Sequence, residues 1–187
     1  MSTGRLEAFS DGVIAIVITI LVLNLTPPKG DSLKDLLGIE HGVFIYLLSF
    51  SLVAIYWLNH HHLFQVAKKI NSKVLWANIF FLFSLTLFPF STAWISEHLF
   101  SLFPQLLYGL VICLADCAFL LMVITLSKSN EEPIIKADFR KTVFSILLNI
   151  VALILGIVIN PIMVCLVNLL MILLWISPNK KIEHFLG

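Results

Sequence analysis

The sequence predicts an all-α, multi-spanning membrane protein, and three observations lead to this class. Hydrophobic residues make up 59% of the chain and charged residues 12%, whereas soluble domains contain about 45–50% and about 25%. The mean hydropathy is +1.01. The apolar runs are continuous and lack the alternation of a barrel strand, and only helices and closed barrels satisfy the backbone hydrogen bonds inside lipid. We therefore expect helices that cross a bilayer.

Six apolar windows divide the chain into candidate spans, which we expect to form a single six-helix transmembrane domain over residues 1–187. The windows lie at about 8–25, 43–63, 74–96, 105–126, 142–159 and 161–176. Proline and polar residues separate them, as in Pro27-Pro28-Lys29-Gly30 and Asn160-Pro161. The last two windows barely reach across a hydrocarbon core of about 30 Å, and we expect them to pack at the periphery.

Basic residues gather on one side of the predicted spans, and this asymmetry predicts an orientation. Lysine and arginine near span ends are retained on the cytoplasmic side of a membrane. One side receives Arg5, Lys68, Lys69, Lys73, Lys128, Lys136, Arg140, Lys141, Lys180 and Lys181, and the other receives Lys29 and Lys34. An even number of spans in the cell membrane, with both termini in the cytoplasm, satisfies this pattern.

Charge and motifs exclude several classes of function. The net charge is +1 and no basic cluster is longer than two residues, which argues against nucleic acid as a partner. The sequence contains no GxGxxG, P-loop, HExxH or GxSxG motif, so we expect neither an enzyme nor a cofactor. It also lacks a TVGYG-like segment, so any ion pathway must be lined by side chains.

Polar residues gather near the cytoplasmic ends of the first three predicted spans. Asp11 lies one to two turns into the first span beside Ser10, and an ionisable group at membrane depth is costly. The neighbouring spans bring possible partners to the same level: Trp57, Asn59, His60, His61, His62 and Asn78. An indole N–H, an imidazole or an amide can donate to a carboxylate. We favour a network that anchors the helices to one another, with a proton relay as the alternative.

The triplet His60-His61-His62 raises the question of a metal site. Adjacent helical residues point about 100° apart, so three in a row do not converge on one ion as an i, i+4 pair does. We expect no metal, and pH sensing by these histidines stays open.

Asp116 lies in the middle of the fourth predicted span without an evident partner. Asn149 and Asn168 lie at comparable depths in the fifth and sixth spans. A buried polar cluster that holds helices together is the favoured interpretation, and an ion or proton site is the alternative.

The first span carries a stripe of residues at helical spacing. It consists of Gly12, Ile16, Thr19 and Leu23, with Ile20 at its border. Rings of such side chains around a symmetry axis gate by dewetting, and a hydroxyl ring partly replaces the hydration shell of an ion. The pattern alone fits a helix facing lipid or other helices better.

Two motifs resemble those of the transmembrane protein 175 family of potassium channels, which occurs in bacteria, archaea and animal lysosomes. The first is Arg5 with Phe9-Ser10-Asp11-Gly12-Val13 and Ala15-Ile16, followed by Thr19 and Leu23. The second is Trp57-Leu58-Asn59-His60-His61 at the end of the second span. The six-span length is similar to one prokaryotic subunit, and beyond about residue 65 the likeness rests on hydropathy.

The resemblance implies a homotetramer whose four first helices line a pore that passes K+, and other monovalent cations less well. Ile16 matches the hydrophobic constriction, Ile20 and Leu23 match further pore-facing positions of the gate, and Thr19 matches the position associated with potassium preference. The implied anchoring network consists of Arg5, Phe9, Ser10, Asp11, Trp57, Asn59, His60 and His61.

Two other functions stay open at this point. One is a proton-coupled secondary transporter that uses Asp11, Asp116 and the histidines, although we find no inverted repeat of the kind many transporters have. The other is a membrane scaffold that transports nothing.

Overall fold

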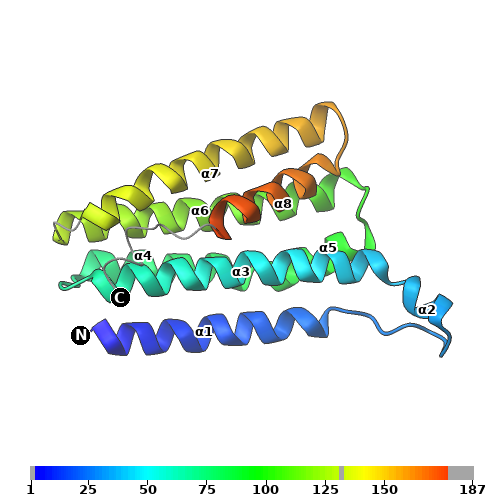
Figure 1. Ribbon diagram of the computed structural model, residues 1–187, viewed down its shortest axis with the longest axis horizontal. Coiled ribbons are helices and arrows are strands. Elements are labelled where there is room, and N and C mark those ends of the chain that lie inside the picture. Colours follow the sequence, from blue (N-terminus) through cyan, green and yellow to red (C-terminus); the bar gives the residue numbers. More distant parts are fainter. Residues whose placement is uncertain (1–2, 131–132, 177–187) are drawn as a thin grey trace.

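The structure, a computed structural model, describes residues 3–130 and 133–176, and these are almost entirely helical. The helices are α1 (Thr3–Leu23), α2 (Leu33–Leu37), α3 (Glu40–Val66), α4 (Ser72–Thr86), α5 (Phe88–Glu97), α6 (Leu102–Ser129), α7 (Pro133–Val158) and α8 (Met163–Ile176). The long helices run side by side along one direction (Figure 1). The chain is thus an all-α bundle, as predicted.

Five helical stretches are long and apolar enough to cross a membrane. They are Thr3–Leu23, Glu40–Val66, Ser72–Glu97, Leu102–Ser129 and Phe139–Val158. The helix α8 has 14 residues, and at about 1.5 Å per residue it is about 21 Å long. It is therefore shorter than a hydrocarbon core of about 30 Å. The described residues form five long spans and one shorter helix.

The helices differ from the predicted windows at several boundaries, and two of these differences show that hydropathy does not register the effects of proline and charge on a helix. The window 74–96 contains two helices, since Pro89 has no N–H to continue the ladder begun in α4 and instead occupies the first turn of α5. The helix α1 begins at Thr3, ahead of the predicted residue 8. Arg5 and Glu7 lower the hydropathy there without interrupting the helix.

The short helix α2 lies outside the predicted spans, in the connection between α1 and α3. Its first turn is held by a capping box, in which the Ser32 N–H donates to the Asp35 carboxylate at 3.1 Å and the Asp35 N–H donates to the Ser32 hydroxyl at 3.3 Å. The hydrogen bonds from Ser32 lower the pKa of Asp35. The Ser-x-x-Asp pattern indicates the start of a helix. Hydropathy windows do not detect it, because α2 is short and contains charged residues.

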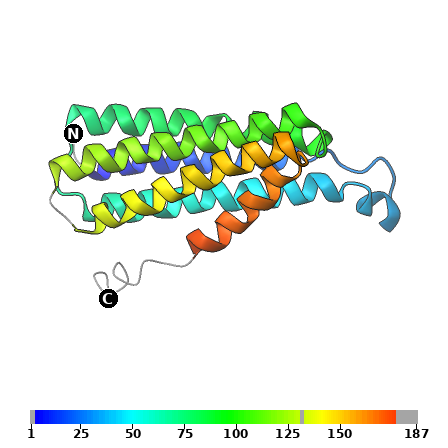
Figure 2. The same cartoon turned by 90° about the horizontal axis from the view of Figure 1, so that it is seen from above.

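The helices form layers that place α1 and α7 at opposite faces of the bundle (Figure 1). The helix α1 packs on α3, α4 and α5, whereas α6 packs on α4, α5, α7 and α8. Figure 2 shows that α8 is inclined to the other helices. Aromatic side chains fill much of the interior, including Phe64, Phe81, Phe88, Tyr108 and Phe119.

A cluster of hydroxyl groups joins three helices inside the bundle. The Thr92 hydroxyl of α5 donates to Ser49 of α3 at 2.8 Å, and the Ser49 and Tyr108 hydroxyls lie 3.0 Å apart. All three side chains are buried. In lipid the hydrophobic effect does not drive helices together, because the lipid tails are as apolar as the helix surfaces. Hydrogen bonds between helices therefore help to hold the bundle together.

The two ends of the bundle differ in charge. The chain begins at the same end as the α3–α4 and α6–α7 connections, and the α1–α3 connection with α2 lies at the other end (Figure 1). The first end, called the basic end below, carries Arg5, Lys68, Lys69, Lys73 and Lys128, and the other carries Lys29 and Lys34. Lys180 and Lys181 lie outside the described residues.

Candidate functional site

The helix α1 has two faces that differ in burial. Every third or fourth residue faces the interior of the bundle: Leu6, Ser10, Ile14, Val17 and Leu21. The predicted stripe lies on the opposite face, where Ile16 is 59% exposed, Ile20 39% and Leu23 79%. Gly12 and Thr19 are exposed there as well. The stripe is therefore not part of the core of the bundle.

Thr19 is the polar member of this α1 stripe. Its hydroxyl donates to the Ile16 carbonyl oxygen of the same helix at 2.9 Å. The proton of the hydroxyl is thereby engaged, and the oxygen lone pairs stay available on the exposed face. A ring of such oxygens offers acceptors to a cation, while the flanking Ile16 and Leu23 side chains offer none.

The partly exposed side of the network at the basic end joins α1 to α3. The Trp57 indole N–H donates to an Asp11 carboxylate oxygen at 2.8 Å, and the Trp57 ring stacks on His61 with ring centroids 5.7 Å apart. His61 Nδ1 lies 2.8 Å from a Glu7 carboxylate oxygen, and His61 Nε2 lies 2.8 Å from Gln65 Nε2. Trp57, one of the six possible partners of Asp11, thus donates to it, and the Asp11 carboxylate holds α1 to α3.

The buried side of this network is centred on Asn78 of α4. Its amide nitrogen donates to the Ser10 hydroxyl oxygen at 3.0 Å, and its Oδ1 lies 2.8 Å from His60 Nε2. Because Oδ1 is an acceptor, His60 Nε2 carries the proton in this arrangement. Ser10, His60 and Asn78 are all fully buried, and the His60 ring stacks on Phe81. One amide therefore joins α1, α3 and α4.

The network includes some of the predicted residues and leaves others out. Of the histidine triplet, His60 faces the interior, while His61 and His62 are partly exposed. Asn59 donates to the Ile55 carbonyl oxygen of its own helix. Arg5 and Phe9 are exposed, and the described residues offer them no hydrogen bond or ion pair.

Glu7 and Gln65 belong to this network although the predicted network did not include them. Glu7 lies one turn before Asp11 on α1, and Gln65 follows His61 by four residues, as His61 follows Trp57. Residues four apart share one face of a helix. Polar residues four apart on α1, and again on α3, are the signal that would have identified both Glu7 and Gln65.

The end of α1 that lies away from the basic end is held by a different contact. The Asn24 amide nitrogen donates at 2.8 Å to the carbonyl oxygen of Pro89. Pro89 lies at the break between α4 and α5.

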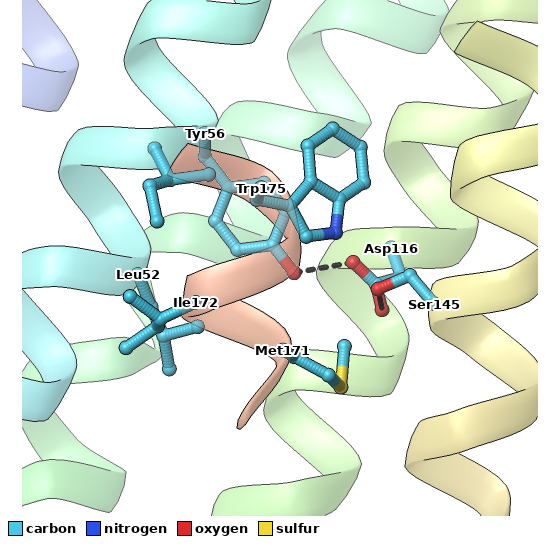
Figure 3. A pocket seen from close by; sticks show the side chains of 8 residues that line it. Leu52, Tyr56, Asp116, Ser145, Met171, Ile172 and Trp175 are labelled. Carbon is cyan, nitrogen blue, oxygen red and sulfur yellow. Dashed lines mark hydrogen bonds between the residues drawn. The ribbon is translucent and has the colours of Figure 1, made fainter. Parts of the chain in front are cut away.

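Asp116 is buried at mid-bundle, and its partners are hydroxyl groups. The Tyr56 hydroxyl donates to one carboxylate oxygen at 2.6 Å, and the Ser145 hydroxyl donates to the other at 2.9 Å. These residues come from α3, α6 and α7 and meet beside Met171, Ile172 and Trp175 of α8 (Figure 3). The adjoining cavity has a volume of about 20 Å³, which is about the space of one water molecule.

The amides of Asn149 and Asn168 do not join Asp116. Both amide atoms of Asn149 are buried without a hydrogen-bond partner among the described residues, and Asn168 donates to the Val164 carbonyl oxygen of its own helix. Ser145 precedes Asn149 by one turn and occupies the place beside the carboxylate. Asp116 thus links three helices, and this favours a structural role for it.

We predict that Asn78→Leu destabilises the protein more than Asn59→Leu. The first change leaves the buried His60 Nε2 without its acceptor, at a cost of about 1–3 kcal/mol. It also removes the bond that joins α4 to Ser10, whose hydroxyl keeps only its bond to the Leu6 carbonyl oxygen of α1. The second removes one bond within a helix. Thermal unfolding of the detergent-solubilised protein measures both, and equal losses would show that Asn78 does not hold the helices together.

We further predict that Tyr56→Phe lowers thermal stability, whereas Tyr46→Phe leaves it nearly unchanged. Tyr56 donates to the buried Asp116 carboxylate, and a bond to a charged group contributes about 1.5–3 kcal/mol. Tyr46 is half-buried, and its hydroxyl has no hydrogen bond within the described residues. The same unfolding assay compares the two variants, and the idea fails if Tyr56→Phe has no larger effect.

Comparison with known proteins places both motifs in one family. The sequence profile described as "Endosomal/lysosomal potassium channel TMEM175" matches residues 5–89. A protein of Chryseobacterium sp. (strain P1-3), named a potassium channel, is 39% identical over 189 residues, which cover 100% of this chain and 98% of the relative. Another potassium channel, from Streptomyces collinus, is 37% identical over 101 residues, covering 52% of this chain and 49% of the relative.

A solved structure has the same fold over nearly the whole chain. It is the crystal structure of a lysosomal potassium-selective channel TMEM175 homolog from Chamaesiphon minutus, with a TM-score of 0.85 and 26% sequence identity. The match covers 93% of this chain and 96% of the other. The resemblance stated from the two motifs is thereby confirmed. Given full-length similarity in both sequence and fold, the chain belongs to the TMEM175 family, a family of multi-pass membrane ion channels and not of enzymes.

Proposed function

We propose that the chain is the subunit of a potassium-permeable channel in the cell membrane, with both termini in the cytoplasm. The observation that carries this proposal is the exposed α1 stripe, which lies on the motif-bearing helix of a chain similar over its full length to a named potassium channel. The lysines and Arg5 of the basic end support the orientation, because basic residues are retained in the cytoplasm.

The proposed assembly is a homotetramer in which each copy contributes residues 1–187 as one six-helix domain. A single copy leaves Ile16, Ile20 and Leu23 uncovered, and one helix cannot enclose a pathway. Rotational symmetry brings the same face of every copy to the central axis. The number four follows from the family resemblance.

The proposed pore has an apolar constriction with one hydroxyl ring inside it. Rings of Ile16, Ile20 and Leu23 form the gate, since narrow apolar rings expel water unless they widen. Thr19 supplies oxygen acceptors between them and gives a weak to moderate preference for K+ over other monovalent cations. No TVGYG-type filter takes part.

The proposed role of the network at the basic end is to hold α1 in register with the pore axis. Ser10 and Asp11 face α4 and α3 through Asn78 and Trp57, so the opposite face of α1 points away from the subunit. We assign the motif to positioning because its carboxylate and buried amide are both engaged by neighbours.

Flux through reconstituted protein tests this function. Purified protein in liposomes with a K+ gradient is expected to release K+ faster than empty vesicles and to pass Na+ more slowly. Flux no greater than that of empty vesicles, at several pH values and voltages, contradicts the proposal. Saturable uptake with counterflow favours the carrier instead, and a detergent particle with the mass of one copy and no flux favours the scaffold.

Ile16→Asn tests the constriction. A polar amide at this level is expected to wet the pore, raising K+ flux several-fold and reducing the difference between K+ and Na+. Ile157→Asn on α7 is the matched control, because Ile157 is 60% exposed and Ile16 is 59% exposed. Conduction that responds equally to the two changes, or to neither, rules out Ile16 as the constriction.

A further inference from the structure

A groove on the surface of the bundle lies between the first turns of α4 and the last turns of α6. It is lined by Ser72, Lys73, Trp76, Ala77, Leu121 and Thr125 and has a volume of about 380 Å³. Its walls come from successive helical turns, since Ala77 follows Lys73 and Thr125 follows Leu121 by four residues. The groove therefore runs along the helices. Lys73 lies at one end of it, and apolar side chains line it farther from that end.

The groove begins at the basic end of the bundle, where the membrane surface meets the protein. Trp76 in its wall is 71% exposed, and exposed tryptophans gather at the level of the lipid headgroups. Leu121 lies two turns inside the end of α6, at the level of the acyl chains. A molecule filling the groove thus meets a polar region first and an apolar region deeper in the membrane.

The groove is separate from the α1 stripe. The helix α6, which forms one wall, packs on α4, α5, α7 and α8, while α1 lies on the other side of α3, α4 and α5 (Figure 1). In a channel whose pore is formed around α1, the helix α6 therefore lies on the side of the subunit away from the pore. The groove therefore serves neither the constriction nor the network of Asn78.

Two asparagines fix the backbone beside the end of the groove that lies at the basic end. Asn71 donates to the Ser129 hydroxyl oxygen at 2.8 Å, which ties the start of α4 to the end of α6. Asn130 reinforces the tie by accepting from the backbone N–H groups of Lys68 and Lys69, each at 2.9 Å.

Lys73 and Lys128 flank these ties on the two helices. Both side chains are exposed, and neither forms an ion pair within the part of the chain that the structure describes. Glu131 and Glu132 follow in the sequence and lie outside the described residues. Lys73 lines the groove, and Lys128 follows the lining residue Thr125 by three residues, which places it one turn farther along the same face of α6.

We propose that this groove is a binding site for an anionic glycerophospholipid. Its phosphate is held by Lys73 and Lys128, and one acyl chain lies along Trp76, Ala77 and Leu121. A negatively charged headgroup complements the two lysines. A zwitterionic headgroup also carries a positive charge, which the lysines repel, so we expect it to bind more weakly. The bound lipid bridges α6 and α4, and α4 in turn packs on α1.

Brominated lipids test the site through Trp76. The whole protein is reconstituted in phosphatidylcholine vesicles that contain a small fraction of phosphatidylglycerol with brominated acyl chains, or the same fraction of brominated phosphatidylcholine. Bromine quenches tryptophan fluorescence at contact, and subtraction of the Trp76→Phe protein isolates the Trp76 signal from that of the other three tryptophans. Brominated phosphatidylglycerol is expected to quench this signal several-fold more effectively.

The lysines are tested by Lys73→Gln combined with Lys128→Gln. Each lysine near an anionic headgroup contributes about fivefold to binding, so the double variant is expected to lose the preference for phosphatidylglycerol. The matched control is Lys29→Gln with Lys34→Gln at the other end of the bundle, which keeps it. In the unmodified protein, raising the salt from about 0.1 M to about 1 M shortens the screening length from about 10 Å to about 3 Å and weakens the preference.

Three results overturn the proposal. Equal quenching by the two brominated lipids shows a surface that does not select headgroups. Absence of quenching by either lipid shows that protein, such as a second copy of the chain, covers the groove. A preference that survives in the double variant shows that Lys73 and Lys128 do not hold the phosphate.

Discussion

The helix α3 is held to its neighbours by polar contacts at three successive levels, and the placement of the other helices depends on them. His60 meets Asn78 near the basic end, Tyr56 meets Asp116 in the middle, and Ser49 meets Tyr108 farther along. Lipid offers no partner to an unsatisfied polar group, so each such side chain must find one inside the bundle. The apolar helices accept many rotations about their axes, and these contacts select one.

This constraint explains how a motif without an obvious chemical role bears on conduction. Ser10 and Asp11 are consecutive, and they reach Asn78 and Trp57 on two different helices. Two contacts in different directions fix the rotation of α1. The residues that face away from those contacts are then the ones the proposed pore uses, although none of them touches the network.

Hydropathy predicted the spans because the free energy of placing a helix in lipid depends on the average composition of the whole segment. It missed features that depend on single residues. Pro89 ends α4 by the absence of one N–H, an effect that disappears in a window of about 19 residues. The level of Asp11 in the membrane was enough to predict Trp57 as one of six possible partners, and the structure selects it. For Asp116 the level was not enough, because Tyr56, Ser145 and Asn149 all lie near its depth and the rotation of each helix decides which one reaches it. Similarly, the α1 stripe could be identified as a pattern, but its exposure required the packed bundle.

The two ends of α1 are fastened unequally. Near the basic end Glu7, Ser10 and Asp11 each contact a neighbouring helix. At the opposite end the Asn24 amide nitrogen donates to the carbonyl oxygen of Pro89. With three contacts near the basic end and one at the far end, we expect a tilt of α1 to pivot near Ser10. Because Leu23 lies farther along α1 from Ser10 than Ile16 does, such a tilt displaces Leu23 more than Ile16.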